Sequence, residues 1–468
     1  MLEQLTITNF RSIRSDTISL QPITVLIGAN GSGKSNLVKA IQFLSDILRF
    51  GISGAASQHG GADAMVPKSV PTTSINKTIT EFTYRARLVS PIETTDDEDP
   101  PLTVEHSIRF RFSHKKNEVR VLAESLTHGQ VLYVSELLRG KKGVSDIPRT
   151  SVTHPSKPST FSIQKSERGA SSFVADPPIG PETIDHYIRW LGLSVLKEKI
   201  TTKDEFEKTL GSLWEHRHRG TGRGQRGHEY TFLDPSVRTI LDFSVQSHVF
   251  EQSQKSIRRY DLLLNELRKE QKPSDSRSLS GSGDNMPGIL GWVMRTRGSR
   301  GRSSWKRLYD TFHNIAPHIA KMQPASLRTG KQFIEFIESK AGRGVESWES
   351  SDGSLRALAI LLAVETADAG STIIIEEPEQ NLHPWAVRIL VDHIREVVEE
   401  REIQVILTTH SEHVLDRTKP EEVRVATRTL KEGTKFRRIT DVAPGVVEMG
   451  EVGRLWVKGL LGGVPSEQ

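Results

Sequence analysis

One stretch near the start of the chain constrains the fold more than any other. The apolar run Ile23–Ile27 ends at Gly28, and after four further residues Gly33, Lys34 and Ser35 begin a segment with apolar residues at helical spacing. A strand, a glycine-rich turn and an amphipathic helix in this order form the setting of a phosphate-binding P-loop. The strand before the turn and the helix after it argue against a chance match in a glycine-rich loop.

The residue types of this turn suit a nucleoside triphosphate and its metal ion. Glycines allow backbone N–H groups to turn inward around a phosphate chain, and the N-terminus of the helix adds partial positive charge. Lys34 is expected to contact the β- and γ-phosphates, and the Ser35 hydroxyl is expected to ligate Mg²⁺. The predicted phosphate-binding residues are Asn30, Gly31, Gly33, Lys34, Ser35 and Asn36.

Composition limits the other chemistries that are open to the chain. Its 468 residues include no cysteine, which excludes disulfides, thiolate zinc sites and cysteine nucleophiles. We identify no signal peptide and no apolar stretch long enough to span a bilayer, so we expect a cytoplasmic protein without a membrane partner. A net charge of +5 permits local nucleic-acid contacts but does not by itself indicate them.

The hydrophobic pattern divides the chain into five segments. Apolar strands alternate with helices in residues 1–50 and 326–440, which indicates an α/β fold with a parallel sheet covered on both faces. Alternating runs predict an antiparallel β-subdomain in residues 51–140. Irregular helical spacing predicts a mostly helical insertion, a lid or arm, in residues 141–325, and residues 441–468 form a C-terminal tail.

Some local expectations follow from the same pattern. Residues 51–76 are rich in Gly, Ser, Ala and Pro and are expected to begin the second segment as a loop. Residues 326–350 predict a pair of strands, of which Gln332–Glu338 is the clearer. The expected helices of the insertion are Ile184–Glu198, Val237–Phe250, Gln254–Lys272 and Ser304–His318.

Two carboxylates follow the buried strand predicted at Thr372–Ile375. Ligands of open α/β sheets bind at the carboxyl ends of the strands, where the P-loop also lies. We therefore expect Glu376 to hold Mg²⁺ through water and Glu377 to polarise the attacking water. The alternative is an exposed acidic turn, which the presence of a P-loop in the same chain disfavours.

A second buried strand, Gln404–Thr408, is followed by His410, which could hydrogen-bond a γ-phosphate and sense its presence. Taken alone, a histidine at this position is more often structural, but its place after the acidic strand favours the functional alternative. The turn Ser351–Ser354 precedes an apolar helix. A turn of this kind can bind an anion, although every capped helix offers the same feature.

These motifs together resemble the ABC-type ATPase head of the SMC, RecF and OLD superfamily. The shared elements stand in that family's order: Asn9–Ser12, the P-loop, Ser351–Ser354, Glu376–Glu379 and Thr409–Ser411. The resemblance implies ATP and Mg²⁺ as cofactors, and a homodimer that sandwiches ATP between two heads, with further assembly left open.

Residue roles follow from the resemblance. Ser351 and Gly353 correspond to the signature that contacts the γ-phosphate bound by the second subunit. Arg11 and Ser12 correspond to residues near the base or the phosphates. The residues that match the D-loop, which crosses the dimer interface, are Gln380, Asn381 and His383. For the Q-loop glutamine we can name only Gln58 and Gln130 as guesses.

Two departures from the usual family pattern point to the OLD-like branch. Glu376 replaces the usual aspartate of the acidic strand, and Asp352 replaces a glycine of the transporter signature. OLD-type relatives carry a Toprim nuclease after the ATPase, whereas only 468 − 410 = 58 residues follow His410 here. We identify no nuclease site, and Asp97–Asp99 is expected to be an acidic turn. Residues 453–465 resemble the end of a branch of uncharacterised predicted ATPases.

Two basic stretches could contact nucleic acid. Residues 216–228 hold four Arg and three His, and residues 294–307 hold six Lys or Arg, with no acidic residue in either. Their Gly/Ser setting predicts flexible phosphate-binding segments, and solvated loops are an equally good alternative.

The resemblance favours one function over two others. We expect an ATPase that regulates a DNA- or RNA-directed process, in antiphage defence or DNA maintenance, with a separate effector such as a nuclease, as in Septu-type antiphage systems. One alternative is a slow-turnover, ATP-dependent DNA clamp or sensor that acts without an effector. A transporter ATPase ranks last, because 351 − 34 = 317 residues separate Lys34 from Ser351, far more than in transporter heads.

Overall fold

The computed structural model describes most of the ATPase-like segments. The described residues are 1–87, 103–113, 118–128, 131–138, 147–154, 157–165, 171–176, 257–296, 299–339, 342, 344–444 and 452–461. Across these ranges, no helix combines the length and the apolar character that crossing a membrane requires.

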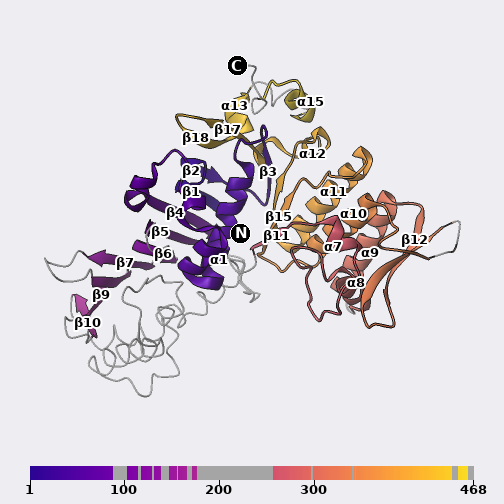
Figure 1. Cartoon of the computed structure of the whole chain (residues 1–468), viewed down its shortest axis with the longest axis horizontal. Coiled ribbons are helices and arrows are strands. Elements are labelled where there is room, and N and C mark those ends of the chain that lie inside the picture. Colours follow the sequence, from indigo (N-terminus) through magenta and orange to yellow (C-terminus); the bar gives the residue numbers. More distant parts are fainter. Residues whose placement is uncertain are drawn as a thin grey trace.

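Five neighbouring strands run parallel and form the part of the sheet that carries the site. In spatial order they are β17 (Val423–Thr429), β3 (Ile23–Ile27), β16 (Gln404–Thr408), β15 (Thr372–Glu376) and β11 (Ile257–Tyr260). Strands from the two ends of the sequence therefore lie side by side (Figure 1). Their carboxyl ends share one edge, as the sequence predicts.

An antiparallel region continues the sheet, which contains 15 of the described strands. Strand β18 (Gly433–Arg438) joins the two regions, because it pairs antiparallel with both β17 and β2. The other antiparallel strands, in spatial order, are β2 (Ile13–Ser19), β1 (Leu2–Phe10), β4 (Ile79–Arg87), β5 (Thr103–Ser113), β6 (Glu118–His128), β7 (Val131–Leu138), β8 (Ile147–His154), β9 (Lys157–Lys165) and β10 (Ser171–Asp176).

These strands confirm the predicted α/β fold with a parallel core and an antiparallel region. The antiparallel strands continue to Asp176, past the boundary predicted at residue 140. The expected helices at 184–198 and 237–250 lie outside the described residues. The division into five domains stays a prediction.

Helices cover both faces of the parallel strands. Helix α1 (Lys34–Gln58) packs on one face, and α10 (Asp352–Glu365) and α11 (Pro384–Arg401) pack on the other. Side chains along each strand alternate between the two layers. Leu26 belongs to the hydrophobic cluster on the side of α1, whereas Val25 belongs to the cluster on the side of α10 and α11. This alternation explains why the strands read as continuous apolar runs.

A small helical and β region packs beside α10 and α11 (Figure 1). It contains α8 (Met286–Arg295), α9 (Ser299–Ile315) and a separate sheet of β12 (Ile319–Ser326), β13 (Gln332–Glu338) and β14 (Gly344–Glu346). The clearer strand predicted in 326–350 is confirmed as β13. Short elements complete the C-terminal part: α12 (Glu412–Leu415), η3 (Pro420–Glu422), α13 (Ile439–Val442) and α15 (Val452–Val457).

Two local predictions are wrong. The helix expected at 254–272 is instead the strand β11 followed by the short helix α7 (Leu264–Arg268), because four residues can pair with β15 and be buried beside it. The loop expected at 51–76 is largely helical: α1 continues beyond a kink at Gly51, and α2 (Gly61–Met65) and η1 (Thr72–Lys77) follow. Alanine and buried apolar residues in this segment outweigh its glycines.

Candidate nucleotide-binding and catalytic site

The P-loop lies between β3 and α1, and close packing requires two of its glycines. Gly28 has φ of 144° and Gly33 has φ of 109°, conformations that L side chains rarely adopt. A Cβ at Gly28 would collide with the carbonyl oxygen of Ala426, and one at Gly33 would collide with the side chain of Thr434. The turn therefore depends on contacts from β17 and β18, which no sequence motif marks.

Lys34 folds back into the turn that precedes it. Its Nζ donates to the carbonyl oxygens of Gly28 at 2.6 Å and Ala29 at 3.3 Å. Burial lowers the pKa of Lys34, and the nearby carboxylates of Glu377, Glu376 and Glu379 oppose that shift. The acceptors of this ammonium are neutral carbonyls, so a phosphate would be a stronger partner.

The predicted metal ligands face each other. The Ser35 Oγ donates to Oε2 of Glu376 at 3.2 Å. Within the described residues, no group of three or more His, Cys, Asp or Glu side chains could hold an ion. A hydroxyl and one carboxylate suit Mg²⁺, which is usually bound by one or two protein oxygens, substrate phosphates and water. The residues present therefore fit the ion that the sequence predicts.

Glu377 follows directly and adopts an uncommon backbone conformation. Its φ is 48°, in the left-handed region that non-glycine residues rarely occupy. Its backbone N–H donates to the carbonyl of Thr408 at 2.8 Å, which ties the end of β15 to the end of β16. The side-chain amide of Gln380 donates to the Glu377 carboxylate. Strained backbone of this kind is typical of functional sites.

His410 is held at the same edge by Glu379. The Glu379 Oε1 accepts from the Thr409 hydroxyl at 2.7 Å and from the His410 backbone N–H at 2.9 Å. Burial and then the charge of Lys34 lower the pKa of His410, and the carboxylates of Glu377 and Glu379 oppose that shift, so the site favours the neutral imidazole. The sequence points to the Glu-Glu-Pro-Glu motif but does not reveal this bracing role of Glu379.

The signature turn caps helix α10. The Ser351 Oγ accepts from the Ser354 backbone N–H at 3.2 Å. A Cβ on Gly353 would lie 2.5 Å from the carbonyl oxygen of Asn381, which explains the glycine at this position. The signature and the predicted D-loop of the same chain are thus in direct contact. His383 caps the next helix, α11, by accepting from the Trp385 backbone N–H at 3.2 Å.

Two arginines that sequence reasoning misses hold the signature turn and the end of the acidic strand. Arg268 of α7 donates to the carbonyl oxygens of Trp348 at 2.6 Å and Ser350 at 2.8 Å, and it pairs with Asp352. The buried Arg356 of α10 donates to the carbonyl oxygens of Glu376 at 3.1 Å and Glu377 at 3.0 Å. Both act on backbone carbonyls that are distant in sequence, so no local pattern marks them.

Ser12 and Arg11, adjacent in sequence, reach different places. The Ser12 Oγ accepts from the Asn36 amide at 2.6 Å and hydrogen-bonds Thr434 Oγ1 at 2.7 Å, so it braces the P-loop. The Arg11 guanidinium instead donates to the carbonyl of His59 at 3.1 Å. The structure brings Ser12, but not the Arg11 side chain, into contact with the P-loop.

The remaining predicted residues fall into three groups. The exposed Asn30 and Gly31 lie in the turn beside Lys34. In the described parts of the chain, no hydrogen bond joins Ser351 or Gly353 to the P-loop. Gln58 lies at the end of α1, and Gln130 lies outside the described residues, so neither guess for the Q-loop gains support.

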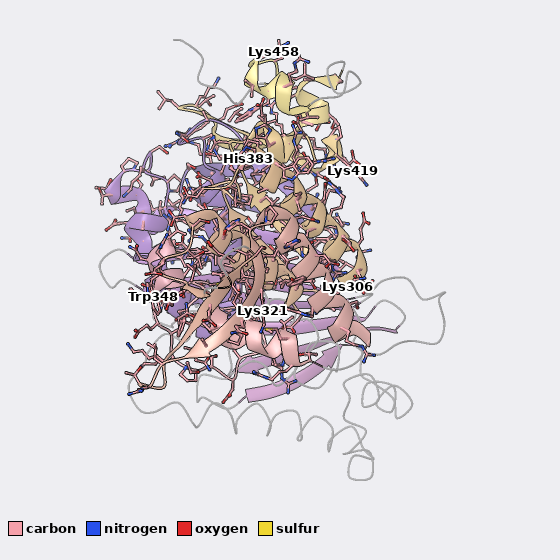
Figure 2. All side chains as sticks on the ribbon, turned by 90° about the vertical axis from the view of Figure 1, so that its right-hand side faces the viewer. Lys306, Lys321, Trp348, His383, Lys419 and Lys458 are labelled. Carbon is pink, nitrogen blue, oxygen red and sulfur yellow. The ribbon has the colours of Figure 1, made fainter. Side chains whose placement is uncertain are left out.

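The second basic stretch is not a flexible loop over its described length. Residues 299–307 belong to α9, and Arg307 is paired with the buried Glu365 at 2.7 Å and with Glu400. Lys306 remains exposed on the same helix (Figure 2). Because Arg307 serves the core, it cannot also serve as a free phosphate contact. Residues 216–228 lie outside the described residues.

The fold and this edge of the sheet define the class: an α/β protein with a P-loop of the nucleotide-binding kind. A family model described as "AAA ATPase domain" matches residues 1–116, and one described as "AAA domain, putative AbiEii toxin, Type IV TA system" matches residues 216–416.

Curated relatives match shorter stretches. The DNA replication and repair protein RecF of Renibacterium salmoninarum is 38% identical over 68 residues, and the Old nuclease of Escherichia phage P2 is 47% identical over 45 residues. These alignments cover 14% and 10% of this chain. The chain matches only 17% of the length of RecF and 8% of the length of the Old nuclease.

Two solved structures align at low identity. A SmcHead bound to the C-winged helix domain of ScpA covers 93% of this chain and 97% of its own at 10% identity, with a TM-score of 0.40. The SMC head domain from Thermotoga maritima covers 93% and 98% at 12% identity, with a TM-score of 0.31. The family models and curated relatives confirm the predicted resemblance to ATPases of the SMC, RecF and OLD superfamily.

Proposed function

We propose that this protein binds and hydrolyses ATP at the edge formed by β3, β15 and β16, and that two heads close around the nucleotide. The observation that carries the proposal is the convergence of Ser35, Glu376 and Glu377 at that edge, with the His410 loop hydrogen-bonded beside them. A P-loop supplies phosphate binding, and the two carboxylates supply a metal-facing and a water-facing group.

Each residue has a separate task in this proposal. Backbone N–H groups of the P-loop bind the phosphates, and Lys34 exchanges its carbonyl partners for phosphate oxygens. Ser35 and Glu376 hold Mg²⁺, which neutralises charge on the phosphates when bound. Glu377, steadied by the Gln380 amide, accepts a proton from the attacking water.

The signature of one head would complete the site of the other. Ser351 is exposed at the start of α10, where the partial positive charge of the helix can meet a γ-phosphate. Trp348 and Trp385, 38% and 62% exposed, lie next to the signature and the D-loop in sequence. Exposed tryptophans are common anchors of protein interfaces, so this surface supports a homodimer.

We also propose that the ATPase regulates a process on nucleic acid. The supporting observation is that the two curated relatives are named for DNA replication and repair and as a nuclease. Antiphage defence or DNA maintenance, with a separate effector, extends this proposal. A pull-down of Glu377→Gln beside Lys34→Ala tests it. A second protein or nucleic acid retained by the former supports the extension, and recovery of neither contradicts it.

Turnover of the purified chain tests the catalytic proposal. Glu377→Gln should bind ATP with the affinity of the wild type but hydrolyse it at least about a hundredfold more slowly, because a general base is lost. Lys34→Ala should fail to bind ATP tightly. Equal turnover by wild type and Glu377→Gln would contradict catalysis by Glu377 and leave an ATP-dependent clamp or sensor. Retained tight binding by Lys34→Ala would contradict the P-loop assignment.

A further inference from the structure

A cation that no motif predicts sits on the metal-binding carboxylate. Arg259 belongs to β11, which pairs in parallel with the acidic strand β15, so both strand ends lie at the same edge. The Nε of Arg259 lies 2.7 Å from Oε1 of Glu376 in an ion pair. The side chains are only 26% and 22% exposed, so solvent screens this pair less than a surface salt bridge.

The two oxygens of Glu376 therefore face different partners. Oε2 accepts from the Ser35 hydroxyl at 3.2 Å, on the side where Mg²⁺ is expected, and Oε1 faces the guanidinium. A carboxylate held from both sides has a fixed orientation. Groups that orient a metal ligand in this way commonly control metal affinity.

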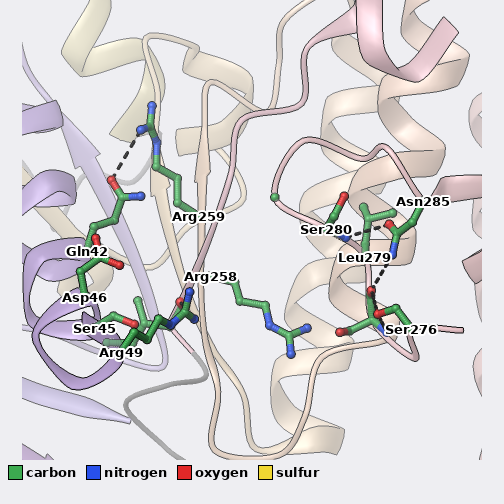
Figure 3. A pocket seen from close by; sticks show the side chains of 13 residues that line it. Gln42, Ser45, Asp46, Arg49, Arg258, Arg259, Ser276, Leu279, Ser280 and Asn285 are labelled. Atoms are coloured by element: carbon green, nitrogen blue, oxygen red, sulfur yellow. Dashed lines mark hydrogen bonds between the residues drawn. The ribbon is translucent and has the colours of Figure 1, made fainter. Parts of the chain in front are cut away.

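Arg259 also has partners away from the carboxylate. Its Nη1 donates to the Gln42 side-chain oxygen at 3.5 Å, and its Nη2 lies 3.6 Å from the Asp261 carboxylate. Figure 3 shows Arg259 directed toward Gln42 at a pocket of about 350 Å³ beside α1. Arg258, the next residue in the strand, instead pairs with Asp368 at 3.4 Å. Side chains of consecutive strand residues point to opposite faces, so Arg258 offers a matched control.

The charge of Arg259 has a consequence for the ion. The guanidinium of Arg259 places a full positive charge beside the Glu376 carboxylate. This positive charge offsets the negative charge of the carboxylate and repels a divalent cation at Oε2. At an effective dielectric constant of about 20, a unit charge a few Å away changes the affinity for an ion by about tenfold or more.

We propose that Arg259 is a positioning residue of the metal site: it fixes Glu376 toward Ser35, and its charge keeps Mg²⁺ affinity low until nucleotide phosphates join the site. This inference rests on the proposed nucleotide site. Because Arg259 belongs to β11, a change in the position of this strand would move the guanidinium relative to Glu376 and would so alter metal binding.

Metal binding measured without turnover tests the proposal. We would titrate Mn²⁺ into the full chain without nucleotide, so that free ADP does not chelate the ion, and follow the electron paramagnetic resonance signal of free Mn²⁺; ADP binding is measured separately by isothermal titration. Arg259→Gln removes the charge but keeps an N–H donor that can orient Glu376, so we expect it to bind Mn²⁺ about tenfold more tightly than the wild type. Arg259→Lys keeps the charge and should stay within about twofold of the wild type, as should the control Arg258→Gln.

The outcomes separate this inference from the proposed function. Unchanged or weaker Mn²⁺ binding by Arg259→Gln, or equal tightening by Arg259→Lys, would overturn it while the nucleotide site stands. A wild type that does not bind ADP would overturn the nucleotide site itself, and with it this inference. Thermal unfolding of each variant verifies that it is folded, because a purely structural role would shift the melting temperature without changing the metal affinity.

Discussion

The Ser35 hydroxyl donates a hydrogen bond to Glu376 at 3.2 Å across 341 residues of sequence. The contact exists because β3, β16 and β15 are adjacent and parallel, so the helix that follows the P-loop starts opposite the end of the acidic strand. It joins the two halves of the predicted metal site. The remaining elements of the site are arranged around it.

Ser35→Ala tests this contact. Removal of the hydroxyl takes away the protein oxygen expected to ligate Mg²⁺ directly, so ATP affinity in the presence of Mg²⁺ should fall by about tenfold or more. Affinity in EDTA should change little. Isothermal titration under both conditions provides the measurement. The control Ser57→Ala, at an exposed serine of the same helix, should match the wild type. A loss of ATP affinity by Ser35→Ala that is equally large in EDTA would contradict a metal role for Ser35.

Gly353→Ala tests the contact between the signature and the D-loop. The new Cβ would lie 2.5 Å from the Asn381 carbonyl oxygen, so the D-loop must shift away. We expect the variant to keep nucleotide binding at its own P-loop but to lose ATP-dependent dimerisation. Analytical ultracentrifugation with ATP measures the second effect, and a normal dimer would contradict this role of the glycine.

Arg268→Ala should loosen the signature turn. The guanidinium donates to two backbone carbonyls and pairs with Asp352, and hydrogen bonds to charged groups contribute about 1–3 kcal/mol each where they are protected from solvent. Its partly exposed setting places the loss at the lower end of that range. We expect a lower melting temperature and weaker ATP-dependent dimerisation. Arg328→Ala, at an exposed arginine, is the control; equal behaviour of the two variants would contradict the anchoring role.

His393 predicts a pH dependence of stability. Burial and then the charge of Arg307 lower its pKa from 6.5 to about 3. The neighbouring Glu365 does not reverse this, because Arg307 at 2.7 Å and Arg401 at 3.8 Å balance its charge. The unfolded chain binds a proton at His393 more readily than the folded chain does. The free energy of unfolding therefore keeps its full value above pH 6.5 and decreases as the pH falls toward 3.

Urea unfolding at pH 7.0 and 5.0 checks that prediction. Because each pH unit changes stability by at most about 1.4 kcal/mol for one proton, the wild type should lose stability more steeply than His393→Asn. Thr311, which hydrogen-bonds His393 at 3.0 Å, should tolerate the asparagine. Parallel pH profiles for the two proteins would show that His393 is not the titrating group.

The sequence predicts the parts of the site that contiguous motifs encode. Gly33, Lys34, Ser35, Glu376 and Glu377 lie where glycine geometry and strand ends require them. Their spacing within each motif is enough to infer the chemistry, and the order of the motifs points to the family.

The parts that depend on contacts between distant segments could not be predicted. Arg259 lies in a strand of four residues, too short for its alternation to stand out from helical spacing. Arg268 and Arg356 bind backbone carbonyls, which every residue carries. Arg307 looks like a nucleic-acid contact in a basic run, and only the packing of α9 against the buried Glu365 reveals its structural role.

The most direct test of the central claim is the mass of Glu377→Gln in saturating Mg²⁺ and ATP, measured by sedimentation equilibrium. A chain of 52.3 kDa that closes around ATP should sediment at twice its monomer mass with ATP and return to its starting mass when ATP is removed. The double variant Lys34→Ala/Glu377→Gln should show no such change. A mass that ATP does not alter in Glu377→Gln would contradict the ATP-sandwiched dimer.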